Sequence, residues 1–232
     1  MTEKPDSKID FPAILASSVH DIKNSLGAIR ALIAELATQH QELAGKNDFI
    51  QLEYEANRMN NSLMQLLILY KIDRKRFQIS IDEHSTLDIL NEIVAQQADL
   101  LALNNIQLET ACPEDLYCFC DAALICNAIG TILNNAQRYA HKRILLSAYR
   151  QDEYVAFSIE DDGEGYPEAF LNMPPRAKNM QIDYHTGSTG LGLYFVAIIA
   201  EMHGNGHKKG LILNDNHSSL NVGGARFILF LP

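Results

Sequence analysis

Basic residues are scarce in this chain, which has 19 Lys and Arg against 29 Asp and Glu and a formal net charge of -10. Because a nucleic-acid surface needs positive charge to meet the phosphates, this balance disfavours a nucleic-acid partner. One basic run, at Lys71, Arg74, Lys75 and Arg76, interrupts the acidic composition. We interpret it as a solvated joint between domains rather than a membrane or anion patch.

The chain also lacks a signal peptide and any apolar run of membrane-spanning length. We therefore expect a cytoplasmic protein with no membrane insertion. The 232 residues, 47% of them hydrophobic, suit two domains that each bury a core. Only a short polar stretch, 1–11, precedes the first periodic segment. The chain is therefore interpreted either as self-contained, with its signal arriving through a separate sensor partner, or as an excised core.

Cysteines are few, and their spacing does not suit a metal site. Cys112, Cys118, Cys120 and Cys126 lack the C-x2-C spacing of a zinc centre. Cys118 and Cys120 alternate along a predicted strand and should point the same way. Buried, reduced thiols and no protein-ligated metal cluster are the favoured interpretation.

Two familiar phosphate-binding motifs are missing as well. No stretch fits the Walker pattern G-x-x-x-x-G-K-[ST], and the third-glycine position of a Rossmann fingerprint after Gly190 and Gly192 holds Phe195.

Two other glycine motifs are present in a fixed order. The first is Asp161-Asp162-Gly163-Glu164-Gly165, and the second is the run 187–193, GSTGLGL. Glycine lets a backbone approach a ligand closely and present N–H groups to phosphate oxygens. The second motif leads into the helix-compatible run 194–200, whose N-terminus would favour phosphate. Asp161 could accept a hydrogen bond from an exocyclic amine such as that of adenine, whereas Asp162 and Glu164 are interpreted as solvated turn residues.

A third element, 131–140, precedes these motifs and is predicted to be helical. Its apolar stripe comprises Ile125, Ala128, Ile129, Ile132, Leu133 and Ala136. Asn135 and Arg138 share a face of this helix. An amide oxygen can join the oxygen shell of Mg²⁺, and a guanidinium can contact phosphate.

In this order the three elements resemble the N, G1 and G2 boxes of the Bergerat-fold ATPases, the family of gyrase, Hsp90, MutL and histidine kinases. The resemblance implies an α/β sandwich with one mixed sheet covered by helices, and it implies ATP and Mg²⁺ as ligands. By position, Asn135 resembles the Mg²⁺-binding asparagine and Asp161 the adenine-binding aspartate. The other residues that the resemblance assigns to nucleotide binding are Arg138, Tyr139, Gly163, Gly165, Thr189, Gly190, Leu191 and Gly192.

The chain departs from the family pattern at three places. Thr131 stands where the first asparagine of the N box is expected, the F box is only faintly present around Phe170, and the lid, about 166–189, is individual in sequence. The closing run 223–232 resembles the last strand of the kinase branch.

The N-terminal third indicates which branch this is. Two heptad seams occur: Leu15, Val19, Ile22, Leu26, Ile29, Ile33 and Leu36, then Phe49, Leu52, Ala56, Met59, Leu63, Leu66 and Tyr70. The break at 45–48 predicts a helical hairpin in which Asn47 or Asp48 caps the second helix. Because one hairpin buries its seam poorly, we expect a homodimeric four-helix bundle.

His20 flanks the first seam, so it should be reachable from solvent. His20-Asp21-Ile22-Lys23-Asn24 resembles the H box of histidine kinases. Neutral imidazole is a nucleophile near its pKa of about 6.5. A carboxylate bonded to Nδ1–H would present Nε2, and we assign that role to Asp21. Asn24 resembles the polar residue that helps water attack the phosphorylated partner.

The expected organisation is a polar tail at 1–11, a dimerisation and phosphotransfer hairpin at 12–75, and an ATP-binding domain at 76–232. Within the last we predict a helix at 86–103, starting at Ser85 or Thr86. Strands are predicted at 77–81, 106–110, 116–120, 144–148, 155–159, 211–214 and 226–231.

The sequence thus predicts a dimeric protein-histidine kinase that phosphorylates His20 from ATP and passes the group to an aspartate of a response regulator, with phosphatase activity as a further role. Two other classes stay open. One is a phosphotransfer relay with a vestigial ATP domain, and the other is a nucleotide-switched Bergerat ATPase or regulatory module.

Overall fold

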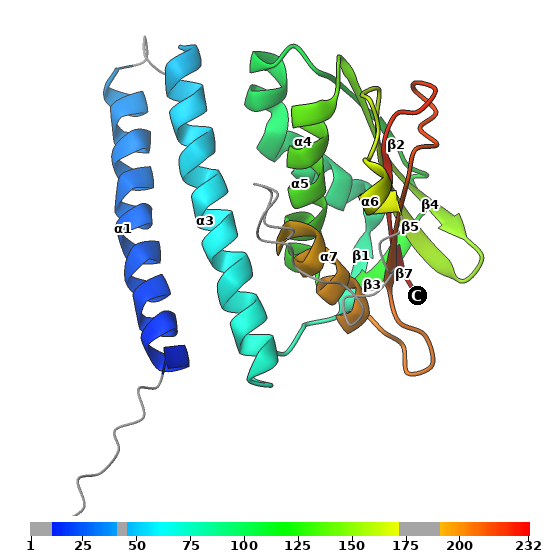
Figure 1. Cartoon of the computed structure of the whole chain (residues 1–232), viewed down its shortest axis with the longest axis horizontal. Coiled ribbons are helices and arrows are strands. Elements are labelled where there is room, and N and C mark those ends of the chain that lie inside the picture. Colours follow the sequence, from blue (N-terminus) through cyan, green and yellow to red (C-terminus); the bar gives the residue numbers. More distant parts are fainter. Residues whose placement is uncertain (1–10, 41–45, 172–190) are drawn as a thin grey trace, which may run out of the picture. The chain divides into compact units, whose positions relative to one another are not determined.

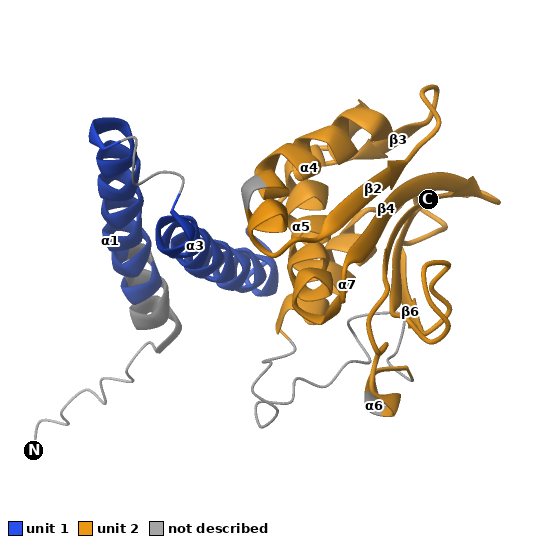
Figure 2. Cartoon of the chain, turned by 90° about the horizontal axis from the view of Figure 1, so that it is seen from above, with its two compact units in different colours: residues 1–77 blue, residues 78–232 orange. Residues whose placement is uncertain are grey.

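The computed structural model describes residues 11–40, 46–171 and 191–232; within these ranges the side chains of 11–17, His20, Asp99 and Ala169 are left undescribed. The chain divides into two compact units, 1–77 and 78–232 (Figure 2). Across the described ranges, none of the helices combines the length and apolarity needed to cross a membrane.

The first unit is a pair of helices, α1 (Phe11–Gln39) and α3 (Asn47–Asp73), which pack against each other (Figure 1). Leu26, Ile33 and Ala56 form its core, with Phe49 and Leu63 packed against them. These residues belong to the two predicted seams, and their three- and four-residue spacing keeps them on the inner faces of the helices.

The predicted capping of α3 was wrong. Lys46 occupies the N-cap position and makes no side-chain cap bond, while Asn47 and Asp48 lie inside the first turn. Asp48 still suits that turn, because a carboxylate there interacts favourably with the positive end of the helix dipole.

Part of each seam remains exposed within this unit. Along α1 the exposed members are Ile22, Ile29 and Leu36, which repeat every seven residues. Along α3 they are Leu52 and Met59, also seven apart. The hairpin therefore buries one line of apolar side chains between its helices and leaves a second line exposed.

The second unit is built on a mixed sheet of five strands in the order β2-β4-β5-β7-β6. The strands are β2 (Gln107–Ala111), β4 (Arg143–Gln151), β5 (Tyr154–Asp161), β6 (Leu211–Asp215) and β7 (Arg226–Leu231). Only the β2–β4 pairing is parallel; β4–β5, β5–β7 and β7–β6 are antiparallel. A separate antiparallel pair joins β1 (Asp82–Ser85) to β3 (Tyr117–Cys120).

Three helices cover one face of this sheet: α4 (Thr86–Leu103), α5 (Ala122–Tyr139) and α7 (Leu191–Met202) (Figures 1 and 2). The short helix α6 (Glu168–Leu171) lies beside β6. The predicted apolar stripe of α5 is confirmed, since all six of its members are buried. So is the start of α4, where the Ser85 hydroxyl accepts from the amide of Asp88. An α/β sandwich after an N-terminal helical hairpin is the fold class that the sequence predicted.

The predicted strand at 77–81 was wrong. These residues form no strand, and the chain enters β1 only at Asp82. The Ser80 amide donates to the side chain of Asp121 at 3.2 Å, and the Ile81 side chain is exposed. The segment connects α3 to β1 without joining a sheet, because the Ser80 amide bonds to a side chain and not to the backbone of a neighbouring strand.

The two cysteines of β3 point inward, as predicted, and their sulfurs lie 3.6 Å apart. Cys126 is also buried, whereas Cys112 is only partly buried, contrary to the expectation for it. All four thiols are free, and in the described ranges no group of three or more His, Cys, Asp or Glu is arranged to hold a metal ion.

Candidate nucleotide-binding site

Asp161 ends β5 with its carboxylate almost wholly buried. Its Oδ1 accepts from the amide of Gly163 at 2.9 Å and from the amide of Ala225, just before β7, at 3.4 Å. Burial raises the pKa of Asp161, and these two amide bonds oppose that rise. Within the described residues Oδ2 makes no hydrogen bond, so this oxygen is available to accept from a ligand amine.

The glycines around Asp161 are required by close backbone approach. A Cβ at Gly163 would lie 2.3 Å from the carbonyl oxygen of Tyr139, at the end of α5. One at Gly224 would lie 2.2 Å from the carbonyl oxygen of Asp161. A Cβ at Gly165 would also clash with the carbonyl oxygen of Gly223, and the φ of Gly165 is +82. Both the lack of space and the backbone conformation therefore exclude a side chain at this position.

The predicted N box lies near the end of α5, directly beside this turn. Asn135 is half-buried, whereas Arg138 and Tyr139 are exposed. The neighbouring Asn134 has a buried Oδ1 that finds no hydrogen-bond partner among the described residues. Thr131, the departure from the family pattern, donates its hydroxyl to the carbonyl of Asn127 at 2.7 Å. Thr131 therefore satisfies its polar group inside its own helix.

The second glycine motif is brought against the N box. α7 begins at Leu191, and a Cβ at Gly192 would lie 2.9 Å from Cγ2 of Thr131. Gly192 thus allows the first turn of α7 to pack closely on α5. The amides at such a helix start have no intrahelical acceptor and can bind an anion. Thr189 and Gly190 lie outside the described residues.

Asp162 differs from the solvated turn residue that the sequence predicted. Its Oδ1 accepts from the amides of His141, Lys142 and Arg143 at 2.9, 3.0 and 3.1 Å. Slight burial raises the pKa of Asp162, but these amide bonds lower it below the usual value. These bonds close the α5–β4 turn onto the glycine motif. Glu164 is exposed, as predicted.

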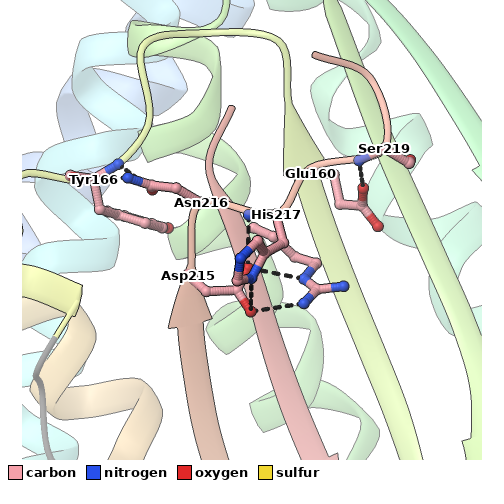
Figure 3. Close-up of polar contacts among 7 residues, drawn as sticks. Glu160, Tyr166, Asp215, Asn216, His217 and Ser219 are labelled. Carbon is pink, nitrogen blue, oxygen red and sulfur yellow. Dashed lines mark hydrogen bonds and ion pairs between the residues drawn. The ribbon is translucent and has the colours of Figure 1, made fainter. Parts of the chain in front are cut away.

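Two asparagines of the β6 end, which sequence reasoning missed, hold the segment after Gly165. Oδ1 of Asn216 accepts from the amide of Tyr166 at 2.6 Å, and Nδ2 of Asn216 donates to the Tyr166 carbonyl at 3.0 Å (Figure 3). Asn214, buried in β6, donates to the carbonyl of Phe170 in α6. Together they fix 166–170 along the edge of the sheet. The only available signal was the clustering of Asn and Asp at the end of a strand.

Charged groups strengthen the same edge. Asp215 accepts two hydrogen bonds from the guanidinium of Arg226, at 3.0 and 2.7 Å, and another from the amide of His217 at 3.0 Å (Figure 3). Glu160 accepts from the amide of Ser219 at 2.5 Å. The loop between β6 and β7 is thereby tied to β6 through His217 and to β5 through Ser219, which steadies Asn216 in turn.

The remaining predicted residues lie in the first unit. Asp21 and Asn24 are exposed positions of α1. His20 lies in the same helix, and its side chain is outside the described atoms.

Residues 120–232 match the family model of histidine kinase-, DNA gyrase B- and HSP90-like ATPases. This span contains all three glycine and asparagine motifs of the site. A match to an ATPase domain over these residues implies ATP binding.

Curated relatives are sensor kinases of low identity. The chain is 23% identical to the sensor histidine kinase CpxA of Escherichia coli, over 94% of this chain and 46% of CpxA. It is 23% identical to the sensor-like histidine kinase SenX3 of Mycobacterium bovis, over 82% of this chain and 48% of SenX3. It is 30% identical to the sensor histidine kinase YkoH of Bacillus subtilis, over 65% of this chain and 33% of YkoH. The chain spans less than half of each of these relatives.

Solved structures share the fold. Full-length ShkA in complex with AMPPNP superposes with a TM-score of 0.65 at 17% identity, over 95% of this chain and 46% of that one. The histidine kinase AdeS of Acinetobacter baumannii gives a TM-score of 0.59 at 16% identity, over 91% and 96%. The solved structures therefore show the fold, whereas the family match over residues 120–232 and the sensor-kinase relatives support a two-component histidine kinase core that carries a histidine kinase-, DNA gyrase B- and HSP90-like ATPase domain.

Proposed function

We propose that this chain is an ATP-dependent protein-histidine kinase that phosphorylates His20. The observation that carries the proposal is the convergence of three motifs in one place: the buried Asp161, the glycines that let backbones approach it, and the contact of Gly192 with the N-box helix. These are features of a nucleotide site, and the relatives are sensor kinases. ATP, the phosphoryl donor, is abundant in the cytoplasm, which is the location we propose.

In the proposed reaction, the neutral imidazole of His20 attacks the γ-phosphorus of ATP through Nε2. A phosphorus–nitrogen bond forms as the bond from that phosphorus to the β–γ bridging oxygen breaks, releasing ADP. Asp21 accepts the proton from Nδ1 and keeps the ring in the reactive orientation. The amides at the start of α7 stabilise phosphate charge, while Asp161 holds the adenine amine.

Asn135 is the residue we assign to Mg²⁺, with Arg138 and Tyr139 beside it on the same end of α5. Its amide oxygen is of the hard type that Mg²⁺ prefers, and it is half-buried one helical turn before Tyr139, whose carbonyl lies against the glycine turn. When bound, the metal would neutralise charge on the phosphates of ATP.

Incubation with γ-labelled ATP and Mg²⁺ tests this assignment directly. We expect acid-labile, alkali-stable label in the wild-type chain and its loss in both His20→Ala and Asn135→Ala, because one removes the nucleophile and the other the metal ligand. His40→Ala changes an exposed histidine that directly follows the last residue of α1. This variant is the matched control and should keep the label.

The other two classes give different results in the same assay. ATP turnover without a covalent phosphoprotein would indicate a nucleotide-switched ATPase. Absence of both label and ATP binding would indicate a relay whose ATP domain is vestigial.

We further propose that phosphorylated His20 donates to an aspartate of a response-regulator receiver domain, and that Asn24 assists the reverse hydrolytic reaction. Asn24 lies one helical turn after His20, so both face the same docked partner. A separate sensor protein would supply the signal.

Substitution of Asn24 should therefore separate two activities. Asn24→Ala is expected to retain autophosphorylation and to lose phosphatase activity toward a phosphorylated receiver domain, since a water-orienting amide is removed while the nucleophile stays. Release of inorganic phosphate from the labelled receiver measures the second activity. Unchanged phosphate release in this variant would contradict the role.

A homodimer is proposed from the exposed residues of the two seams. Ile22, Ile29 and Leu36 repeat every heptad along α1, and Leu52 and Met59 do so along α3. Such lines of apolar side chains are stabilised when a second hairpin completes a four-helix bundle.

Charge placed on this line should weaken the dimer. Ile29→Glu is expected to raise the dimer dissociation constant by about tenfold or more, because each copy loses apolar burial and gains a buried charge. Ala28→Glu, at the adjacent exposed position off the seam, is the matched control. Sedimentation equilibrium measures both, and equal effects of the two substitutions would argue against the seam.

The asparagine contacts at β6 predict a binding effect distant from the ligand itself. Asn216→Ala removes two hydrogen bonds to Tyr166, each contributing about 1 kcal/mol, and frees the backbone that follows Gly165. We expect ATP-analogue affinity to fall about tenfold, as measured by fluorescence titration. Asn205→Ala, at an exposed turn, is the control and should bind normally. Unaltered affinity of Asn216→Ala would show that the segment is held without these bonds.

A further inference from the structure

His203 is buried to 1% exposure immediately after α7, and the proposed reaction does not use it. Its Nδ1 lies 2.7 Å from the carbonyl oxygen of Ile199, in the last turn of α7. Its Nε2 lies 3.0 Å from the backbone amide of Asp121, just before α5. One imidazole therefore joins the end of one nucleotide-motif helix to the beginning of the other.

The partners determine the protonation state of this ring. A carbonyl can only accept and an amide can only donate, so Nδ1 must carry the hydrogen and Nε2 must be bare. Burial lowers the pKa of His203, with the bond to Ile199 and the charge of Asp121 opposing this, so the neutral ring is favoured. Protonation would place an N–H against the Asp121 amide and break the link.

Asp121 is itself a junction. Its Oδ1 caps α5 by accepting from the amide of Leu124 at 3.2 Å, and its other carboxylate oxygen accepts from the amide of Ser80 at 3.2 Å. The start of α5, the end of α7 and the segment that enters the second unit thus meet at this residue.

The two helices contact again further along. α5 and α7 pack together, and Gly192 lies against Thr131. The His203 bond joins the end of α7 to the start of α5, whereas Gly192, in the first turn of α7, lies against Thr131 at the middle of α5. The helices therefore run antiparallel with two fixed points. Each helix behaves as a rigid rod, so a bond at one end sets the axial position of the other.

We propose that His203 is a positioning residue for nucleotide binding, holding α7 in register with α5 so that the amides at the start of α7 and the amide of Asn135 face the same ligand. This inference rests on the proposed function, since it assigns the site an ATP ligand.

Three substitutions test it. His203→Leu keeps the volume but leaves the Asp121 amide unpaired in the interior. His203→Gln offers an oxygen near the position of Nε2 and should restore that bond. His207→Leu changes an exposed histidine of the same turn and is the matched control.

We expect His203→Leu to weaken binding of a fluorescent ATP analogue about tenfold, at a temperature where circular dichroism shows both proteins folded. His203→Gln should recover most of the affinity, and His207→Leu should match the wild type. Hydrogen exchange of the Asp121 amide, followed without nucleotide, should accelerate in the leucine variant only.

The outcomes separate this inference from the kinase assignment. Normal affinity in His203→Leu, or equal losses in the leucine and glutamine variants, would overturn the positioning role while leaving ATP binding intact. A wild-type chain that fails to bind the analogue would overturn the proposed function. The hydrogen-exchange measurement needs no nucleotide, so unchanged exchange of the Asp121 amide in the leucine variant would overturn the link between the helices whether or not ATP binds.

Discussion

The buried carboxylate of Asp161 is the contact on which the rest of the second unit depends. It receives amides from the glycine turn that follows β5 and from Ala225, the residue just before β7, so one side chain joins the end of β5, the glycine turn and the entry to β7. A buried carboxylate is costly unless its oxygens are hydrogen-bonded. Backbone must therefore come close to it, and that demand explains the glycines at 163 and 224, where a Cβ would collide with carbonyl oxygens.

The same end of the sheet is held by polar contacts rather than by apolar packing. Asp162 gathers three amides of the α5–β4 turn, Asn216 pairs with both backbone groups of Tyr166, and Asp215 binds Arg226 in a two-point contact. The opposite arrangement holds beneath the helices, where Phe157, Phe195 and Phe227 are fully buried. Such a division suits a ligand site, because directional bonds can fix loops that have too little apolar surface to pack.

Sequence reasoning succeeded where a long periodic pattern and a local signal agreed. The six-residue stripe of α5 repeats over several turns, and Ser85 caps α4 within its own segment. It failed where the deciding partner lies far along the chain. Residues 77–81 alternate like a strand, but the Ser80 amide is bonded to Asp121, forty-one positions later. Asn47 and Asp48 both resemble caps, yet the helix begins at Asn47 itself, so neither residue occupies the N-cap position.

The sequence alone determined the glycine and asparagine motifs, their order and the heptad seams, because each of these patterns depends on residues close together in the chain. That was enough to predict an α/β nucleotide-binding domain behind a helical hairpin. Only the tertiary structure decided that Asp162 closes a turn, that Asn214 and Asn216 hold the segment after Gly165, and that His203 joins α7 to α5. These roles come from bonds between distant segments, and an asparagine or histidine has too many possible partners for its own neighbourhood to choose among them.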